Sequence, residues 1–153
     1  MSSFGLTMRA TQAFFDRQKV QARVDRAERR VLSRAGAFIR RRARSSIRRR
    51  KRTASPGQPP SAHSTDRAAT LKNILFAYEE QSQSVVIGPV KLNGQKGHVP
   101  RLLEEGGTAT IERRRGKQRV RVVAHYHAFP FMGPALEAEA PKFPDLWRDQ
   151  VRE

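Results

Sequence analysis

The sequence predicts an α+β fold: a long basic N-terminal helix packed on a small, mostly antiparallel sheet with a β-hairpin, closed by a C-terminal helix. Three observations lead to this prediction. Residues 7–50 lack proline and repeat apolar residues at helical spacing, residues 85–125 contain β-branched runs bounded by Gly and Pro, and Gly133-Pro134 opens a helix-favouring segment. A chain of 153 residues holds one hydrophobic core, so residues 1–153 are expected to form a single domain.

The N-terminal helix forms most of a helical segment predicted over residues 1–52. Its polar positions are mostly Arg, Lys, Gln and Glu, which favour helices. Gly36 is the one position where this helix could kink or break, because glycine costs about 1 kcal/mol relative to alanine inside a helix. Apolar residues at steps of three and four form one face, namely Val20, Val24, Ala27, Val31, Ala35 and Phe38, with Leu32, Ile39, Ala43 and Ile47 beside them.

A run of positive charge ends this helix, since nine of the thirteen residues from Arg40 to Arg52 are basic. One or two cations satisfy a helix dipole, whereas nine repel one another, which predicts contact with a polyanion. Duplex DNA is a good candidate because phosphate contacts need charge and no sequence code. A solvated helix end and a nuclear-localisation signal are the alternatives. The predicted contact residues are Arg40, Arg41, Arg42, Arg44, Arg48, Arg49, Arg50, Lys51 and Arg52.

Residues 53–66 are predicted to be a loop too polar for a core, because four Pro and Gly residues between positions 56 and 60 stop any helix. The sheet region is expected over residues 67–132. Within it, Leu71–Tyr78 reads as a strand or short helix, and Gln81–Val90 as a strand that Gly88-Pro89 ends.

Thr108–Arg113 and Gln118–His125 are predicted to be the arms of a β-hairpin, with Gly116 in its turn able to adopt a positive φ. Val120, Val122 and Ala124 alternate with other residues, as in a half-buried strand. The basic residues of the hairpin end either discourage edge-to-edge aggregation or form a second polyanion contact. They are Arg113, Arg114, Arg115, Lys117 and Arg119.

The C-terminal helix is expected over residues 133–153. Pro134 suits a first helical turn because its missing N–H costs nothing there. Pro141 and Pro144 are expected to interrupt the helix, and Trp147, with Leu146 and Val151, to dock on the sheet or on a neighbouring subunit.

Catalytic and metal sites are not predicted, and neither is a cofactor. His125 and His127 could face one metal but have no evident third ligand, so ordinary strand histidines are the better interpretation. Glu104 and Glu105, taken as strand neighbours, would point to opposite faces. One of them is instead expected to brace the Gly106-Gly107 turn or to pair with an arginine of the next subunit.

The composition favours an intracellular, polyanion-binding protein. Lys and Arg outnumber Asp and Glu by 31 to 14, giving a formal charge of +17, and there is no cysteine. No apolar run approaches the roughly 20 residues of a membrane helix, and the N-terminus lacks the pattern of a signal peptide. We therefore expect a cytosolic product with no membrane contact.

Two short motifs, Leu102–Thr108 and Pro130–Leu136, resemble the head–tail joining or tail-completion (neck) proteins of long-tailed bacteriophages. They match "Glu-x-Gly-Thr" followed by "Pro-Phe-x-x-Pro-Ala-Leu". Within this family, the chain is similar to proteins of the lambda minor tail protein Z kind. The resemblance covers about residues 35–136. The chain departs from it at Ser64-Thr65-Asp66, where a Thr-Gly pair is usual. Supporting matches in the same order are Ser55–Pro60, His63, Leu71–Ile74 and Val86–Pro89.

The resemblance implies a structural virion protein, assembled in the bacterial host cytoplasm, that forms a ring at the neck or tail top. It implies a homo-oligomer, a hexamer or a dodecamer, around duplex DNA in the channel, in contact with neck, portal-side or tail-tube proteins. The alternative is a free-standing, sequence-independent nucleic-acid-binding protein. Predicted ring-interface residues are Glu104, Glu105, Phe129, Phe131, Met132 and Trp147, with a core role as the other interpretation of Phe129, Phe131 and Met132.

Overall fold

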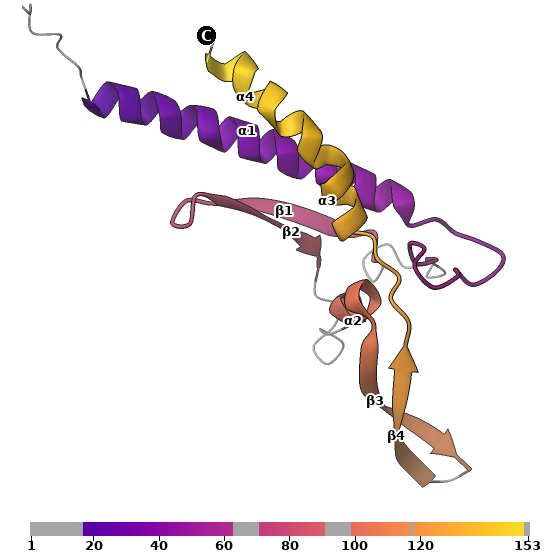
Figure 1. Ribbon diagram of the computed structural model, residues 1–153. Coiled ribbons are helices and arrows are strands. Elements are labelled where there is room, and N and C mark those ends of the chain that lie inside the picture. The colour runs from indigo at the N-terminus through magenta and orange to yellow at the C-terminus, as the bar shows by residue number, and fades with distance from the viewer. Residues whose placement is uncertain (1–16, 63–70, 91–98, 117, 152–153) are drawn as a thin grey trace, which may run out of the picture.

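The computed structural model describes residues 17–62, 71–90, 99–116 and 118–151. Its first hairpin and its C-terminal helices both pack on the long N-terminal helix, whereas a second hairpin projects from this body (Figure 1). This architecture confirms the α+β prediction. The elements are α1 (Arg17–Ser46), β1 (Ile74–Glu79), β2 (Ser84–Pro89), α2 (Val99–Glu105), β3 (Gly107–Arg115), β4 (Gln118–Tyr126), α3 (Gly133–Glu139), the 3₁₀ turn η1 (Ala140–Lys142) and α4 (Phe143–Val151).

Helix α1 buries its apolar face only where other described elements pack on it. Its buried side chains recur at steps of four, at Val31, Ala35, Ile39 and Ala43. Val20 and Val24, eleven and seven residues before Val31, lie on the same side of the helix but are 40% and 47% exposed, because no described element reaches that end of the helix. The predicted residues 7–16 lie outside the described part of the chain.

The described helix ends at Ser46, so the prediction of a helix to residue 50 or 52 is wrong. The Ser45 and Ser46 hydroxyls donate to the carbonyls of Arg42 and Ala43, three residues back, at 2.8 Å each. Such bonds compete with the helical backbone pattern. Ile47 then turns fully into the core, and Arg48 forms a bridge with Ser61.

Gly36 allows the first hairpin to lie close to α1 without kinking it. β1 and β2 pair antiparallel, from Ile74 opposite Pro89 to Glu79 opposite Ser84. A Cβ on Gly36 would lie 3.0 Å from side-chain atoms of Phe76 and Val85. The glycine therefore serves close packing of the helix on the sheet, and α1 continues through this position without a break.

The segment before the Gly-Gly pair is helical, which corrects its interpretation as a strand end. Pro100 lies in the first turn of α2, where proline is tolerated, and Arg101 pairs with Glu105 one turn on. Gly106 ends the helix with φ 73°, and its N–H donates to the Leu102 carbonyl at 2.9 Å.

The strands form two separate two-stranded sheets within the described residues, both antiparallel. β3 and β4 pair from Gly107 opposite Tyr126 to Arg115 opposite Gln118, leaving a two-residue turn with Gly116 at φ 63°. This confirms the hairpin, with a shorter turn than expected.

The C-terminal helices form a nearly continuous rod along α1 (Figure 1). Pro134 lies in the first turn of α3, as predicted. The α-helix is interrupted at Pro141, as predicted, because the 3₁₀ turn η1 separates α3 from α4, and Pro144 lies in the first turn of α4.

The core sits where α1, the start of β1 and the start of α3 meet. The loop after α1 contributes to it, because Ala54 and Pro60 are buried, which corrects the prediction of a loop wholly outside the core. The Gly57 N–H also donates to the Ala128 carbonyl at 2.8 Å. The central residues are Ile39, Ala43, Ile47, Ile74, Phe131 and Ala135.

Candidate polyanion-binding surface

An open groove lined by cations lies beside the C-terminal half of α1. Its volume is about 580 Å³, and it is bounded by one face of the helix and by Lys72, just before β1. The Arg41 guanidinium carbon lies 5.2 Å from the centre of the Phe38 ring, within cation–π range. The lining residues are Ala37, Phe38, Arg40, Arg41, Arg44, Ser45 and Lys72.

The charge of this groove is not neutralised from within. None of its lining residues is acidic. Arg44 and Lys72 make no side-chain hydrogen bond or ion pair with the described residues. Arg41, Arg44 and Lys72 thus form a group of cations suited to a chain of phosphates, which needs charge without a fixed bonding pattern. We call Arg41, Arg44 and Lys72 the basic groove cations.

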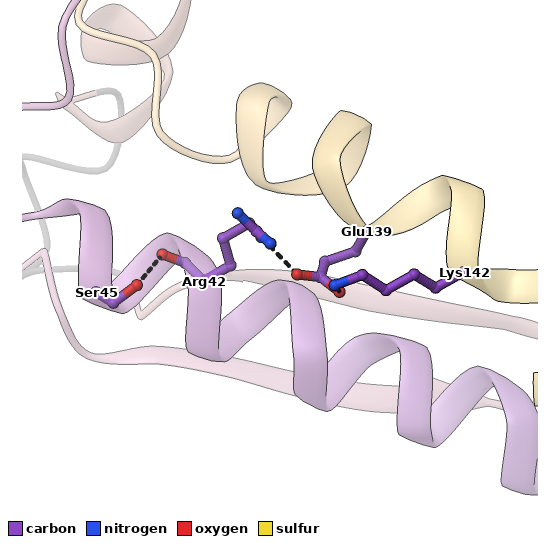
Figure 2. A network of polar contacts seen from close by, with 4 residues as sticks. All are labelled: Arg42, Ser45, Glu139 and Lys142. Atoms are coloured by element: carbon purple, nitrogen blue, oxygen red, sulfur yellow. Dashed lines mark hydrogen bonds and ion pairs between the residues drawn. The ribbon is translucent and has the colours of Figure 1, made fainter.

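Two arginines of the predicted run are instead used to hold the fold together. Arg40 Nε donates to the Ile74 carbonyl at 2.6 Å and so ties α1 to the first residue of β1. Arg42 points to the other side of the helix and pairs with Glu139 of α3 (Figure 2). These side chains are therefore poorer candidates for a polyanion contact than Arg41 and Arg44.

Glu139 is a buried carboxylate with two cationic partners. The Lys142 ammonium donates to its Oε2 at 2.8 Å, while Arg42 donates to Oε1. The hydrogen bonds from Lys142 and Arg42 hold the pKa of Glu139 below its ordinary value, against the opposing effect of burial. The pair joins the C-terminal rod to α1 at the helix position adjacent to the basic groove.

The rest of the predicted run follows the helix as irregular chain. Arg50 donates to the Gln58 amide oxygen at 2.9 Å, which ties it to the Pro-Gly loop. The other cations of this segment are exposed, and their side chains have no hydrogen-bond or ion-pair partner among the described residues; they are Arg48, Arg49, Lys51 and Arg52.

The hairpin arginines do not join this surface, because β3 and β4 project away from α1 (Figure 1). Arg113 and Arg114 are exposed near the hairpin end. Arg119 and Arg121 share Glu112 as an ion-pair partner, at 3.9 and 3.5 Å. The Arg115 side chain and Lys117 lie outside the described residues. The two predicted polyanion contacts are thus separate surfaces.

Glu104 acts inside the chain as a clamp on the start of α3. Its Oε2 accepts from the Phe131 N–H at 2.9 Å, its Oε1 accepts from Gly133 at 2.6 Å, and the Met132 N–H lies 3.1 Å from both oxygens. These N–H groups have no partner within the helix, so the carboxylate satisfies three donors at once. The expected brace of Gly106-Gly107 is therefore wrong: Glu104 braces Phe131–Gly133.

The other predicted interface residues divide between core and surface. Phe131 is 1% exposed and belongs to the core, which leaves its ring no surface to offer a partner subunit. Phe129 is half-buried, and its N–H donates to the Leu103 carbonyl at 2.6 Å. Met132 packs at the edge of the core. Glu105 and Trp147 are exposed, Glu105 in its pair with Arg101.

Sequence reasoning did not find Lys72 or Phe38 as parts of the basic groove. By its spacing Phe38 belongs to the apolar face of the helix, and Lys72 is an isolated cation between Leu71 and Asn73, 28 positions after Arg44 in the chain. Only the packing of β1 on α1 brings them together.

The described residues contain no group of three potential metal ligands, and none of their helices is long and apolar enough to cross a membrane. His125 lies on β4, His127 follows the strand end, and His63 and His98 lie outside the described residues. Comparison with protein-family models, curated proteins and solved structures gave no match to this chain.

Proposed function

We propose that this chain is a structural virion protein of a long-tailed bacteriophage. In this role it forms a ring at the neck or tail top that joins or completes the head–tail connection around the DNA channel. The family is suggested by the motifs from Ser55–Pro60 to Pro130–Leu136, which follow one another along the chain in the order typical of that family. The surfaces of the fold suit assembly around a polyanion.

The basic groove is the observation that carries the proposal. Arg40, Arg42 and Arg50 form hydrogen bonds with other residues of the chain. The basic groove cations instead lie together in an open groove whose lining has no carboxylate. At +17 per chain, a ring of six copies would hold roughly +100 formal charge, which requires DNA or acidic partners nearby.

The test is a cryo-EM reconstruction of the intact particle from the source virus or prophage. We expect the chain as a ring around the channel, with Arg41, Arg44 and Lys72 facing DNA or an acidic neighbouring ring. Its absence from purified particles would contradict the proposal. A ring whose basic groove faces bulk solvent would retain the assembly role and refute the DNA or acidic-partner contact.

A free-standing, sequence-independent nucleic-acid-binding protein is the second candidate. The same groove favours it, because the groove is complete within one chain. Light scattering and DNA titration on the purified protein separate the two functions. A monomer that binds duplex DNA with steep salt dependence and is missing from particles would favour the free binder.

A further inference from the structure

The β3–β4 hairpin has an apolar face that the described residues leave partly exposed. Its register sets Ala109 opposite Ala124 and Ile111 opposite Val122, with Val120 next on the same face. Val120 and Val122 are each 38% exposed. The opposite face carries polar side chains, such as Thr108, Thr110, Glu112, Arg119 and Arg121, and the exposed Val123.

This hairpin has few contacts with the rest of the described residues. Its principal contact with the body is through α2, and it extends away from α1 and the C-terminal rod (Figure 1). A two-stranded hairpin is only marginally stable in water unless its apolar face packs on something else. Since no described element covers this face, it suits a partner from another chain.

A second apolar surface lies on the body, between the first hairpin and the C-terminal rod. It is a groove of about 360 Å³ whose floor is α1 and whose walls are β2 on one side and α3 and α4 on the other. Leu136 on its wall is 47% exposed. Its lining has no charged residue and consists of Leu32, Ala35, Ile39, Val85, Ile87, Met132, Gly133, Leu136 and Phe143.

The groove leads towards acidic side chains at one end. Glu28 is one helical turn from Leu32, and Tyr78, which pairs opposite Val85 on the same face of the first hairpin, lies near the carboxylates of Glu28 and Glu80. Glu80 is also bound by Arg29 at 3.0 Å. The hairpin has the matching order, with apolar residues along its length and Arg113 near its end on the same face.

We propose that the β3–β4 hairpin of one copy docks into the β2–α3 groove of a second copy. Its apolar face, centred on Ile111 and Val122, covers the groove, and Arg113 lies over the acidic side chains of Glu28 and Glu80 near Tyr78. The contact joins two different surfaces, so repeated copies close into a ring when the rotation allows it. This inference rests on the proposed function, because it assigns the subunit contact of the proposed ring.

Disulfide crosslinking tests this contact without background, because the chain has no cysteine. Val122→Cys protein is mixed with Leu136→Cys protein and oxidised mildly. We expect a disulfide-linked pair with one chain of each kind, identified by non-reducing gel and peptide mass spectrometry. Val123→Cys is the matched control: it is adjacent and 59% exposed but lies on the opposite face, and it should give little mixed product.

A charge variant tests the direction of docking. Arg113→Glu should lower the yield of the mixed crosslink roughly tenfold at low salt, because it sets a carboxylate against the acidic end of the groove. Arg114→Glu changes the same charge one position away on the opposite face and should lower the yield much less.

Two results would overturn the inference. Predominant crosslinking of Val122→Cys with itself would show that hairpins pair with each other. Absence of the mixed crosslink would show that the groove does not receive the hairpin, whether light scattering finds the protein to be an oligomer or a monomer. If particles nevertheless contain the ring, only the assigned contact fails. If the crosslink forms but particles lack the chain, the proposed function fails and the contact stands.

Discussion

Removing the Glu104 carboxylate should destabilise the fold much more than removing its neighbour Glu105. Glu104 lies 27 to 29 residues before the three N–H groups that it binds, so it connects α2 to the start of α3. Gly133 permits the close approach, since a Cβ there would lie 3.2 Å from the carboxylate Oε1. Glu105 is exposed, and its one ion-pair partner among the described residues is Arg101 on its own helix.

The magnitude follows from the three donors. A hydrogen bond to a charged group contributes about 1.5–3 kcal/mol, and neighbouring bonds to one carboxylate are not additive. The site is partly buried, so water regains some of the lost bonding after truncation. We expect Glu104→Ala to lower the free energy of unfolding by about 3 kcal/mol and Glu104→Gln by about half as much. Glu105→Ala should cost no more than about 0.5 kcal/mol.

Urea unfolding at neutral pH, followed by far-UV circular dichroism, measures these differences. An unchanged dependence on urea concentration shows that the variants unfold from a similar native state. The reasoning is refuted if Glu104→Ala and Glu105→Ala have the same free energy of unfolding within about 0.5 kcal/mol.

Three further predictions use the same protein. Gly36→Ala should lower the free energy of unfolding in urea, because the new Cβ would lie 3.0 Å from side-chain atoms of Phe76 and Val85. Alanine favours a helix by about 1 kcal/mol over glycine, so the packing effect must exceed this gain. A more stable variant would contradict this packing. Glu139→Gln should be less stable than wild type near neutral pH. The difference should shrink as the pH falls below 4.5 towards the lowered pKa of Glu139, since protonation removes the charge that Lys142 and Arg42 bind; a gap that widens in acid would contradict it. Replacing Arg41, Arg44 and Lys72 together by alanine should reduce the slope of log K against log salt for duplex DNA by about 0.9 per lost phosphate contact. The matched triple of Arg113, Arg114 and Arg119 should leave the slope nearly unchanged, and equal effects of the two triples would refute the assignment.

Local pattern predicts the elements of this fold well but not which of their faces are covered. The four-residue spacing of Val31, Ala35, Ile39 and Ala43 gives the helix, and Gly116 gives the hairpin turn. Val20 and Val24 are also four residues apart but stay exposed, because burial of the helix face depends on how far β1 and the C-terminal rod extend along α1. Helix α2 escaped prediction because seven residues containing a proline carry too little periodicity to separate a helix from a strand.

The candidate site shows the same limit in a sharper form. The basic run was evident from composition, but its division into structural and available arginines was not. Arg41 and Arg42 are adjacent and chemically identical, and only the packing of α3 makes Arg42 the partner of buried Glu139. Lys72 joins the groove through a contact between distant segments, which charge counting along the chain does not detect.

Glu104 links the two surfaces on which the proposed assembly depends. The β3–β4 hairpin extends from α2, and the apolar groove is walled by α3, so the clamp between α2 and α3 fixes the direction of the hairpin relative to the groove. In a head-to-tail assembly this direction sets the rotation from one copy to the next. A rotation that divides a full turn closes a ring, whereas any other gives an open filament. A charged clamp with three donors therefore suits this position better than a flexible linker, since small errors in the direction of the hairpin accumulate around the ring.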